Sequence, residues 1–583
     1  MSRLHHRLFC TAVLAAWVIV PMGCASWFGR NSNDEDREHL QKLLRVPALP
    51  DLIREAAIPN GMQEIRVNGV AVVNQLPGTG GPALPSGFRE RLLEEMKLNE
   101  IPEPNEFLER DSNALVQVRG LIRPGARRGD VIDLQILTPP KTEATDLHGG
   151  WLLDTRLRHQ QLLQNTVRSS DVLAIGTGRM LTRADYDGTE DPTLQVTGRI
   201  LSGGVVQSDR KLGLVVRPQF QHVEVSKAIA KAINSRFYFF DGSTRRGIAK
   251  ATEDDFIEID VHPRYHEREE RLMTVVRALT LAAESSSTQT RLVELGKKLR
   301  TPTTAADAAL QLEAIGEGAV PTLVEATKLE NPELRFYAAE ALAYLDRVEA
   351  IEPLIDSIRA EPAFRAPALI ALQGIDQTSA VAALKGLLDE ASLEARYGAM
   401  AALRDREDGR VTLRGENLQG QFRLYEIESA GPPAVIVSLI RKHEIVLMGD
   451  LTPLPHSMSM IGPDGIVIRP LEDTNTNTDS TRLRISRFRP GKPDAFAEVD
   501  ANVASLIRGI TEVGGVYGDA IATLRMAKEQ GMLVDQLAFD PLPKSQRTYY
   551  RDGADSESEE DDESDENEED GGDEDEDEDE DDE

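Results

Sequence analysis

Two histidines and one glycine-rich turn are the parts of this sequence that come closest to known site chemistry. His262 and His266 are four residues apart with Glu267 beside them, which is the spacing of two zinc ligands on one face of a helix. Pro263 breaks that helical geometry, and the alternating charges of residues 264–271 are typical of a solvated surface. We therefore expect no metal ion here.

The turn at residues 78–81, Gly-Thr-Gly-Gly, could be taken for a phosphate-binding loop. Such a loop needs a following Lys-Ser or Lys-Thr and a helix entry, but Pro82 follows instead. A tight turn is the better interpretation. The sequence also lacks a Gly-x-Ser-x-Gly nucleophile motif. We expect a protein that is not an enzyme, with no catalytic residues and no cofactor.

The first 24 residues have the pattern of an export signal. Arg3 and Arg7 precede the apolar run 8–22, which is long enough for a signal peptide but short for a membrane span. The run ends at Gly23-Cys24-Ala25, which resembles a bacterial lipoprotein signal. Lipidation of Cys24 would attach the protein to a membrane, and residues 25–60 would tether the first domain. An ordinary cleaved secretory signal is the alternative.

Cysteine usage is consistent with export. The two cysteines are Cys10, inside the segment that would be removed, and Cys24. The mature chain can therefore form no internal disulfide, and its stability must come from packing. Ala25 and Ser26 follow Cys24 without an aspartate, which favours the outer membrane as the site of anchoring.

The negative charge of the chain is concentrated at its end. Residues 552–583 contain 24 carboxylates, so removing them changes the net charge from −32 to −8. The remainder has no basic excess to bind nucleic acid. The tail has almost no apolar residue to bury, so we expect it to be disordered. Weak binding of divalent cations or of a basic partner is its alternative role.

The folded part is predicted to be α+β. Alternating apolar residues predict strands near residues 65–73, 115–121, 131–137 and 212–216, whereas residues 88–96 have helical spacing. Val225, Ile229 and Ile233 form one apolar helix stripe, and a strand follows at residues 257–261. We assign residues 61–270 to this first α+β region.

Residues 285–408 contain an internal repeat rich in alanine and leucine. The segment 334–342 recurs at 364–372 and 395–403, about 30 residues apart. Pro321 and Pro353 open successive helices in step with it. This pattern resembles HEAT-like pairs of helices, which must stack in threes or fours to bury a core.

Strand patterns return after residue 408. They occur at residues 411–414, 434–440, 445–449, 465–468 and 483–485. Val503, Leu506, Ile507 and Ile510 then form one helix face, and a second helix begins near Asp519. We assign residues 409–543 to a second α+β region, and expect the repeats to interrupt one body whose two halves pair with each other.

Several motifs resemble the flagellar basal-body P-ring protein family in their order. They are Gly69-Val70-Ala71-Val72-Val73-Asn74-Gln75-Leu76-Pro77-Gly78-Thr79-Gly80, the segment 113–133, Leu147-His148-Gly149-Gly150-Trp151-Leu152-Leu153, Gly198-Arg199-Ile200-Leu201-Ser202-Gly203-Gly204-Val205-Val206, and the closing helix pair from Ser505 to Leu533. At position 148 the family has arginine where this chain has histidine. The motifs cover about residues 60–265 and 410–543.

The resemblance implies a structural subunit of the P ring, which surrounds the flagellar rod in the periplasm and supports motility. Its implied partners are further copies of itself in a homo-oligomeric ring, the rod and L-ring proteins, and peptidoglycan. An alternative follows from the repeats alone, because stacked helix pairs commonly present a concave binding surface. On that interpretation the chain is an envelope lipoprotein scaffold that binds a protein partner.

Overall fold

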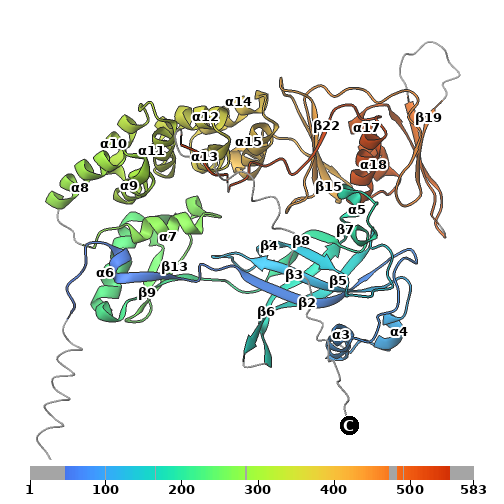
Figure 1. The fold of residues 1–583 in the computed structure, drawn as a ribbon, viewed down its shortest axis with the longest axis horizontal. Helices are drawn as coiled ribbons and strands as arrows, with labels where there is room; N and C mark the ends of the chain where they lie inside the picture. The colour runs from blue at the N-terminus through green and yellow to red at the C-terminus, as the bar shows by residue number, and fades with distance from the viewer. Residues whose placement is uncertain are drawn as a thin grey trace, which may run out of the picture. The chain divides into compact units, whose positions relative to one another are not determined.

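The computed structural model describes residues 46–98, 100–163, 166–281, 285–471, 482–489, 491–545 and 547–551 (Figure 1). The predicted signal segment with Cys24, most of the tether and the acidic tail lie outside the described residues. Helices and sheets both contribute to the structure, so the predicted α+β class is confirmed. No helix among the described residues combines the length and the apolar character needed to cross a membrane.

The chain forms two compact units, and the smaller consists of the described parts of Met1–Asn60, Gly213–Ile259 and Thr280–Ala283. Its sheet has the strand order β1-β9-β13-β12. The predicted apolar stripe of the long helix is confirmed, because Val225, Ile229 and Ile233 are buried. The elements of this unit are α2 (Ile53–Ala56), β1 (Ala57–Asn60), β9 (Leu212–Val216), η2 (Pro218–Phe220), α6 (Val223–Arg236), β10 (Tyr238–Asp241), β11 (Thr244–Gly247), β12 (Ala249–Ala251) and β13 (Phe256–Ile259).

The larger unit begins with an antiparallel sheet in the order β4-β3-β2-β5-β6-β8-β7. Strand β4 also pairs with β8, so six strands close on themselves around an apolar interior that includes Val116, Leu134 and Leu157. Gly176 allows the close packing, because a Cβ there would lie 2.7 Å from Cδ1 of Leu134. The strands are β2 (Ile65–Asn74), β3 (Ala114–Ile122), β4 (Val131–Leu137), β5 (Trp151–Leu163), β6 (Thr166–Arg179), β7 (Leu181–Thr182) and β8 (Gly198–Val206).

Short helices cover part of this sheet. Leu92 and Met96 of α3 (Gly87–Leu98) and Leu108 of α4 (Pro104–Leu108) pack with Val72 and Leu115, whose side chains lie outside the closed interior. The other short helices of this region are α5 (Ala184–Asp187) and η1 (Pro192–Leu194).

Between residues 285 and 410, which are all described, the regular structure is entirely helical. The three copies of the sequence repeat lie in α11, α13 and α15, and Pro321 stands in the first turn of α10. The HEAT-like assignment itself stays a prediction. The helices, with those leading into them, are η3 (Pro263–Tyr265), α7 (Glu269–Arg277), α8 (Ser285–Lys298), α9 (Pro302–Ile315), η4 (Glu317–Ala319), α10 (Val320–Ala326), α11 (Pro332–Tyr344), η5 (Val348–Ala350), α12 (Ile351–Ala360), α13 (Pro362–Gly374), α14 (Thr378–Gly386), η6 (Leu387–Asp389), α15 (Leu393–Asp405) and α16 (Glu407–Arg410).

The last region has two sheets with helices α17 and α18 packed against them. One sheet has the order β14-β15-β17-β16-β22 and the other the order β18-β19-β20-β21. A single buried core includes Leu447, Ile485, Ile507 and Leu524 from the sheets and both helices. The elements are β14 (Glu416–Leu418), β15 (Phe422–Ile427), β16 (Ala434–Val437), β17 (Glu444–Met448), β18 (Met460–Ile461), β19 (Ile466–Leu471), β20 (Arg482–Arg487), β21 (Ala495–Asp500), α17 (Val503–Glu512), α18 (Tyr517–Glu529) and β22 (Gln536–Phe539).

One expectation for this region is wrong. Residues 411–414 form a turn and a loop, not a strand. Val411 is 79% exposed and Leu413 is buried. The amides of Thr412 and Leu413 donate to the carbonyl of Gly409 at the end of α16, so they are not available to a neighbouring strand.

Each sheet of the described residues takes its strands from one side of the repeats only. The two sides share part of a core, in which Leu181, Tyr186 and Leu201 join the last region. The pairing of the two halves into one body stays a prediction.

Candidate functional site

A buried histidine lies between two carboxylates from distant parts of the chain. His148 precedes β5, Asp185 lies on α5 and Asp519 lies in the first turn of α18. Nδ1 of His148 is 2.6 Å from Oδ1 of Asp185, and Nε2 is 2.8 Å from Oδ1 of Asp519. A neutral imidazole has one N–H, so both contacts are hydrogen bonds only when the ring is protonated.

The surroundings favour the charged form of this histidine. Burial on its own lowers the pKa of His148, but the carboxylates of Asp185 and Asp519 outweigh burial and raise the pKa well above its ordinary value. The backbone N–H of His148 also donates to Oδ1 of Asp146 at 2.8 Å. His148 is therefore an imidazolium bound between fixed acceptors.

Asp519 connects the histidine to the last region of the chain. Its Oδ2 accepts from the backbone N–H of Val516 at 2.9 Å and from Nη2 of Arg487 at 3.1 Å. Burial by itself would raise the pKa of Asp519, yet the hydrogen bond from His148 and the nearby charges lower it. The position in the first turn of a helix adds a favourable dipole. Arg487 also donates to Asp464 and to the carbonyl of Gly514.

A second set of polar contacts joins the same two regions. Asp133 on β4 accepts from the backbone N–H of Ser202 and of Arg441, each at 2.7 Å. Nη1 of Arg199 donates to the carbonyl of Leu439 at 2.9 Å. These bonds hold the loop after β16 against the closed sheet.

Glu267 binds two arginines from segments far apart in sequence. Its Oε1 accepts from Nη2 of Arg123 at 3.0 Å and from Nη1 of Arg441 at 2.6 Å. Burial opposes ionisation, but the two guanidinium groups lower the pKa of Glu267 to about 2. These contacts and the histidine network join regions that are far apart in sequence, because His148 and Glu267 each bind a partner from a distant segment.

The histidine pair singled out in the sequence does not form a helical face. His262 has an extended backbone, and its Nδ1 accepts from the backbone N–H of Arg264 at 3.2 Å, which caps η3. His266 is exposed. Within the described part of the chain, no cluster of three or more His, Cys, Asp or Glu side chains is arranged to hold a metal ion.

Two backbone amides of the glycine turn donate to carbonyl groups elsewhere in the chain. The N–H of Gly80 donates to the carbonyl of Asp111 at 2.8 Å, and the N–H of Gly81 donates to that of Asn113 at 2.9 Å. A phosphate loop needs such amides to be available for its ligand. These two amides are not available to a phosphate, and the backbone bends at residues 77–78.

The described residues thus form a closed antiparallel sheet, a smaller compact unit and a set of charged contacts between distant segments. Residues 52–304 match the family model of the flagellar P-ring protein. The resemblance seen in the motifs is thereby confirmed over these residues. No curated protein matches the chain.

The P-ring match covers the smaller unit, the closed sheet and the chain as far as α8 and the start of α9. His148 and Asp185 lie inside this P-ring region, whereas Asp519 lies 371 residues from His148, beyond the match. The motif at residues 147–153 drew attention to position 148, but no local pattern could pair it with Asp185 or Asp519. Sequence reasoning missed the network for that reason.

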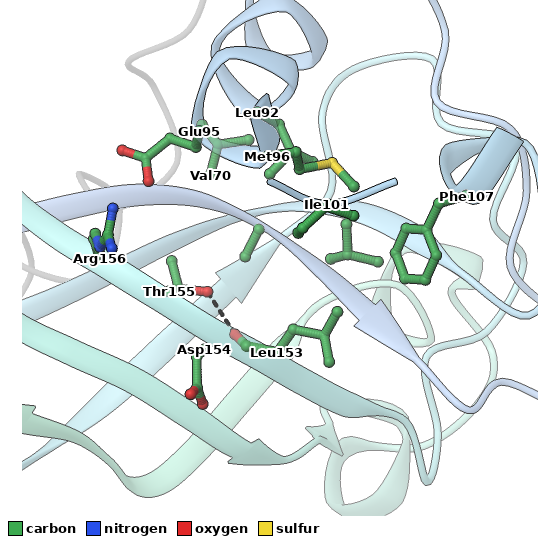
Figure 2. A pocket seen from close by; sticks show the side chains of 12 residues that line it. Val70, Leu92, Glu95, Met96, Ile101, Phe107, Leu153, Asp154, Thr155 and Arg156 are labelled. Carbon is green, nitrogen blue, oxygen red and sulfur yellow. Dashed lines mark hydrogen bonds between the residues drawn. The ribbon is translucent and has the colours of Figure 1, made fainter. Parts of the chain in front are cut away.

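One cavity of about 240 Å³ opens in the P-ring region between β2, β5 and α3 (Figure 2). Its walls are mostly apolar, and the charged side chains of Glu95 and Arg156 lie at the end away from Phe107. Oγ1 of Thr155 donates to the carbonyl of Leu153 at 2.7 Å. The lining residues are Val70, Ala71, Val72, Leu92, Glu95, Met96, Ile101, Phe107, Leu153, Asp154, Thr155 and Arg156.

Proposed function

We propose that this protein is a structural subunit of the flagellar basal-body P ring, where it surrounds the rod within the peptidoglycan layer. The observation that carries the proposal is the match of residues 52–304 to the P-ring protein family. That match supports a component of the flagellar P ring. We further propose that the ring acts as a bushing for the rod and thereby contributes to motility.

A structural role fits the use of charge in the molecule. The family is one of ring proteins and not of enzymes. The buried titratable groups at the candidate site, His148, Asp185 and Asp519, bind one another at 2.6 and 2.8 Å. A catalytic acid or base needs reach to a substrate proton, whereas these groups are engaged in holding two regions together.

The proposed assembly is a homo-oligomeric ring in contact with the rod, the L ring and peptidoglycan. Exposed apolar side chains provide surface that copies of the chain can bury against one another. Phe488 and Phe496 are 46% and 57% exposed and meet edge to face with ring centroids 6.1 Å apart. Aromatic residues exposed beside each other are common at protein interfaces.

We propose that the second α+β region, residues 409–543, completes the P-ring body and that helices α8 to α15 form a HEAT-like insertion in it. The support is the shared core at Leu181, Tyr186 and Leu201 and the bond between His148 and Asp519. We also propose periplasmic localisation with an outer-membrane anchor through lipidated Cys24, which rests on the sequence pattern of residues 1–26.

Deletion of the gene tests the ring role. The deletion strain should lose swimming in soft agar, and electron cryotomography should show basal bodies without a P ring. A plasmid copy should restore both. Intact rings in the deletion strain would exclude this function.

Fractionation of the Cys24→Ala variant tests the anchor. The variant should move from the membrane to the soluble periplasmic fraction, whereas the Cys10→Ala variant should fractionate as the parent does. An unchanged membrane fraction for Cys24→Ala would reject lipidation.

A further inference from the structure

The chain that follows β22 runs along the helical repeats. Pro543 lies against Gly398 of α15, where a Cβ would come within 3.3 Å of its ring. Residues 547–551 then contact α15, α13 and α11 in that order, which is the reverse of the helix order along the chain. This packing of the chain end on the repeats is independent of the P-ring assignment.

Two arginines of this segment bind glutamates of the repeats through two hydrogen bonds each. Nη1 and Nη2 of Arg547 donate to the carboxylate of Glu394 at 2.7 and 2.6 Å. Nε and Nη2 of Arg551 donate to the carboxylate of Glu333 at 2.9 and 2.8 Å. Such forked pairs select arginine over lysine, because they require a planar group with two parallel donors.

An aromatic residue lies between the two arginines. The ring of Tyr549 stacks on Phe364 of α13 with centroids 4.9 Å apart and an interplanar angle of 29°. Phe364 in turn stacks on Phe336 of α11 at 4.4 Å and 6°. The repeats therefore present a flat aromatic surface between their two glutamates.

The segment is extended, and alternate side chains face the helices. Arg547 and Tyr549 are partly buried, whereas Thr548 and Tyr550 are exposed. Arg551 contacts Glu333 although its side chain is 47% exposed. Side chains of an extended chain alternate between two faces. The groups in contact thus follow the pattern Arg-x-Tyr-x-Arg.

The contacted residues lie at the starts of successive repeat helices. Glu333 is the second residue of α11 and Glu394 is the second residue of α15, while Phe364 is the third residue of α13 and follows Ala363 at the equivalent position. Packed helices lie about 8–10 Å apart, so α11 and α15 are separated by roughly twice that distance. Four residues of extended chain span roughly 13 Å. The long arginine side chains cover the remainder.

The two glutamates differ in exposure and in their partners within the repeats. The side chain of Glu333 is 3% exposed and that of Glu394 is 26% exposed. The hydrogen bond from Arg547 is the largest cause of a lowered pKa at Glu394. A buried carboxylate without its partner is costly, so Glu333 favours an occupant that supplies a guanidinium group. Glu394 already contacts Nη1 of Arg365 on α13 at 3.2 Å, and Arg547 adds a second guanidinium group to it.

We propose that the surface formed by Glu333, Phe336, Phe364 and Glu394 is a peptide-binding groove specific for extended Arg-x-aromatic-x-Arg segments, occupied here by residues 547–551 of the same chain. The tethered segment has an effective concentration on the order of millimolar. A partner peptide of the same chemistry therefore binds well only after the tethered segment has been released.

Binding of a labelled peptide with the sequence of residues 543–551 tests the groove, using the full-length protein and fluorescence anisotropy. The protein with its own arginines and tyrosine in place should bind weakly. The triple variant Arg547→Ala, Tyr549→Ala, Arg551→Ala should bind at least tenfold more tightly, because its groove is free. Adding Glu333→Gln and Glu394→Gln to the triple variant should abolish that gain.

Controls separate the groove from general charge attraction and from misfolding. Tyr550→Ala, an exposed position of the same segment, should leave binding at the level of the parent protein, and a peptide with lysine in place of both arginines should bind no variant. Thermal melts of each variant establish that it is folded. Equal binding by the parent and the triple variant would overturn self-occupancy, and no binding by a folded triple variant would overturn the groove. Neither result depends on whether P rings assemble.

Discussion

Nε2 of His148 lies 2.8 Å from Oδ1 of Asp519, although 371 positions separate the two residues in the chain. With Asp185 on the other ring nitrogen at 2.6 Å, the imidazolium bridges the closed sheet and the first turn of α18. The contact also crosses the end of the segment that matches the P-ring family. It makes the last region of the chain dependent on the first, which has measurable consequences.

Replacing His148 with alanine should destabilise the protein strongly. The change leaves the carboxylates of Asp185 and Asp519, whose side chains are 5% and 0% exposed, without their shared cation. Loss of one partner from such a buried arrangement costs roughly 3–5 kcal/mol. Urea denaturation of His148→Ala and of the parent measures the difference in the free energy of unfolding.

Two further variants make that result specific. His148→Arg should recover much of the loss, because a guanidinium group can donate to both carboxylates. His159→Ala removes a histidine whose Nδ1 is 2.8 Å from the carbonyl of Arg66 at an exposed site, and should cost far less. If His148→Ala were as stable as His159→Ala, the network would not connect the regions as described.

The same histidine predicts a loss of stability as the pH rises. The pKa of His148 is raised well above 6.5 in the folded protein, so the folded state retains a proton that the unfolded chain releases near pH 6.5. Stability from this group is fully present below that pH and falls as the pH rises toward the folded pKa. The charged groups near the ring are Asp146, Asp185, Asp519 and Arg487, which reaches the ring through Asp519.

Denaturation curves between pH 6 and pH 9 check this sign. The free energy of unfolding of the parent should fall relative to that of His148→Arg, since arginine stays charged throughout. A constant difference between the two proteins over this interval would show that His148 does not titrate with folding.

Local elements could be predicted from the sequence where one face is apolar. The strand at residues 131–137 is β4, and the stripe of Val225, Ile229 and Ile233 is the buried face of α6. When one face of a helix or strand is buried, apolar residues recur in the sequence with the period of that element. The exposed Val411 lacked such a constraint, and the strand expected around it does not exist.

Contacts between distant segments could not be predicted in the same way. His148 resembled a substitution within a motif, and Asp519 resembled an ordinary residue near a helix start. Nothing in either neighbourhood specifies the other, because their pairing depends on how whole regions pack. The contacts of the segment 547–551 could not be predicted for the same reason. Arg547, Tyr549 and Arg551 find their partners only on α15, α13 and α11.

Arg271 on α7 should be essential for holding the helical repeats to the preceding chain. Its guanidinium group donates to Glu313 at 2.6 Å and contacts Glu340 at 2.7 Å, and it lies 4.1 Å from the ring centroid of Tyr344. Arg271→Ala removes the cation that Glu313 and Glu340 share and leaves Glu313 with the hydrogen bond from Tyr265, so the change should cost roughly 3–5 kcal/mol. Thermal unfolding should show this as a clear fall in Tm.

An exposed ion pair of the same region provides the matched control. Arg300 binds Glu325 at 2.7 Å, but the two side chains are 54% and 69% exposed. Solvent screens such pairs, so Arg300→Ala should change stability by less than about 1 kcal/mol. Similar effects of Arg271→Ala and Arg300→Ala would contradict a special role for the buried arginine.

Gly80 should not tolerate a side chain, although it lies in a loop. A Cβ at this position would stand 2.3 Å from the carbonyl oxygen of Asn113 and 2.7 Å from that of Asp111. Both neighbours are backbone atoms held by hydrogen bonds from Gly80 and Gly81, so they cannot move aside as a side chain could. Gly80→Ala should therefore lower Tm and open the turn between β2 and α3, which amide hydrogen exchange at residues 76–81 would detect.

Gly87→Ala is the matched control, because no atom lies within 4 Å of a Cβ at the start of α3 and alanine favours a helix. That variant should be as stable as the parent or slightly more so, and equal stability of the two alanine variants would show that the turn yields more readily than its hydrogen bonds imply.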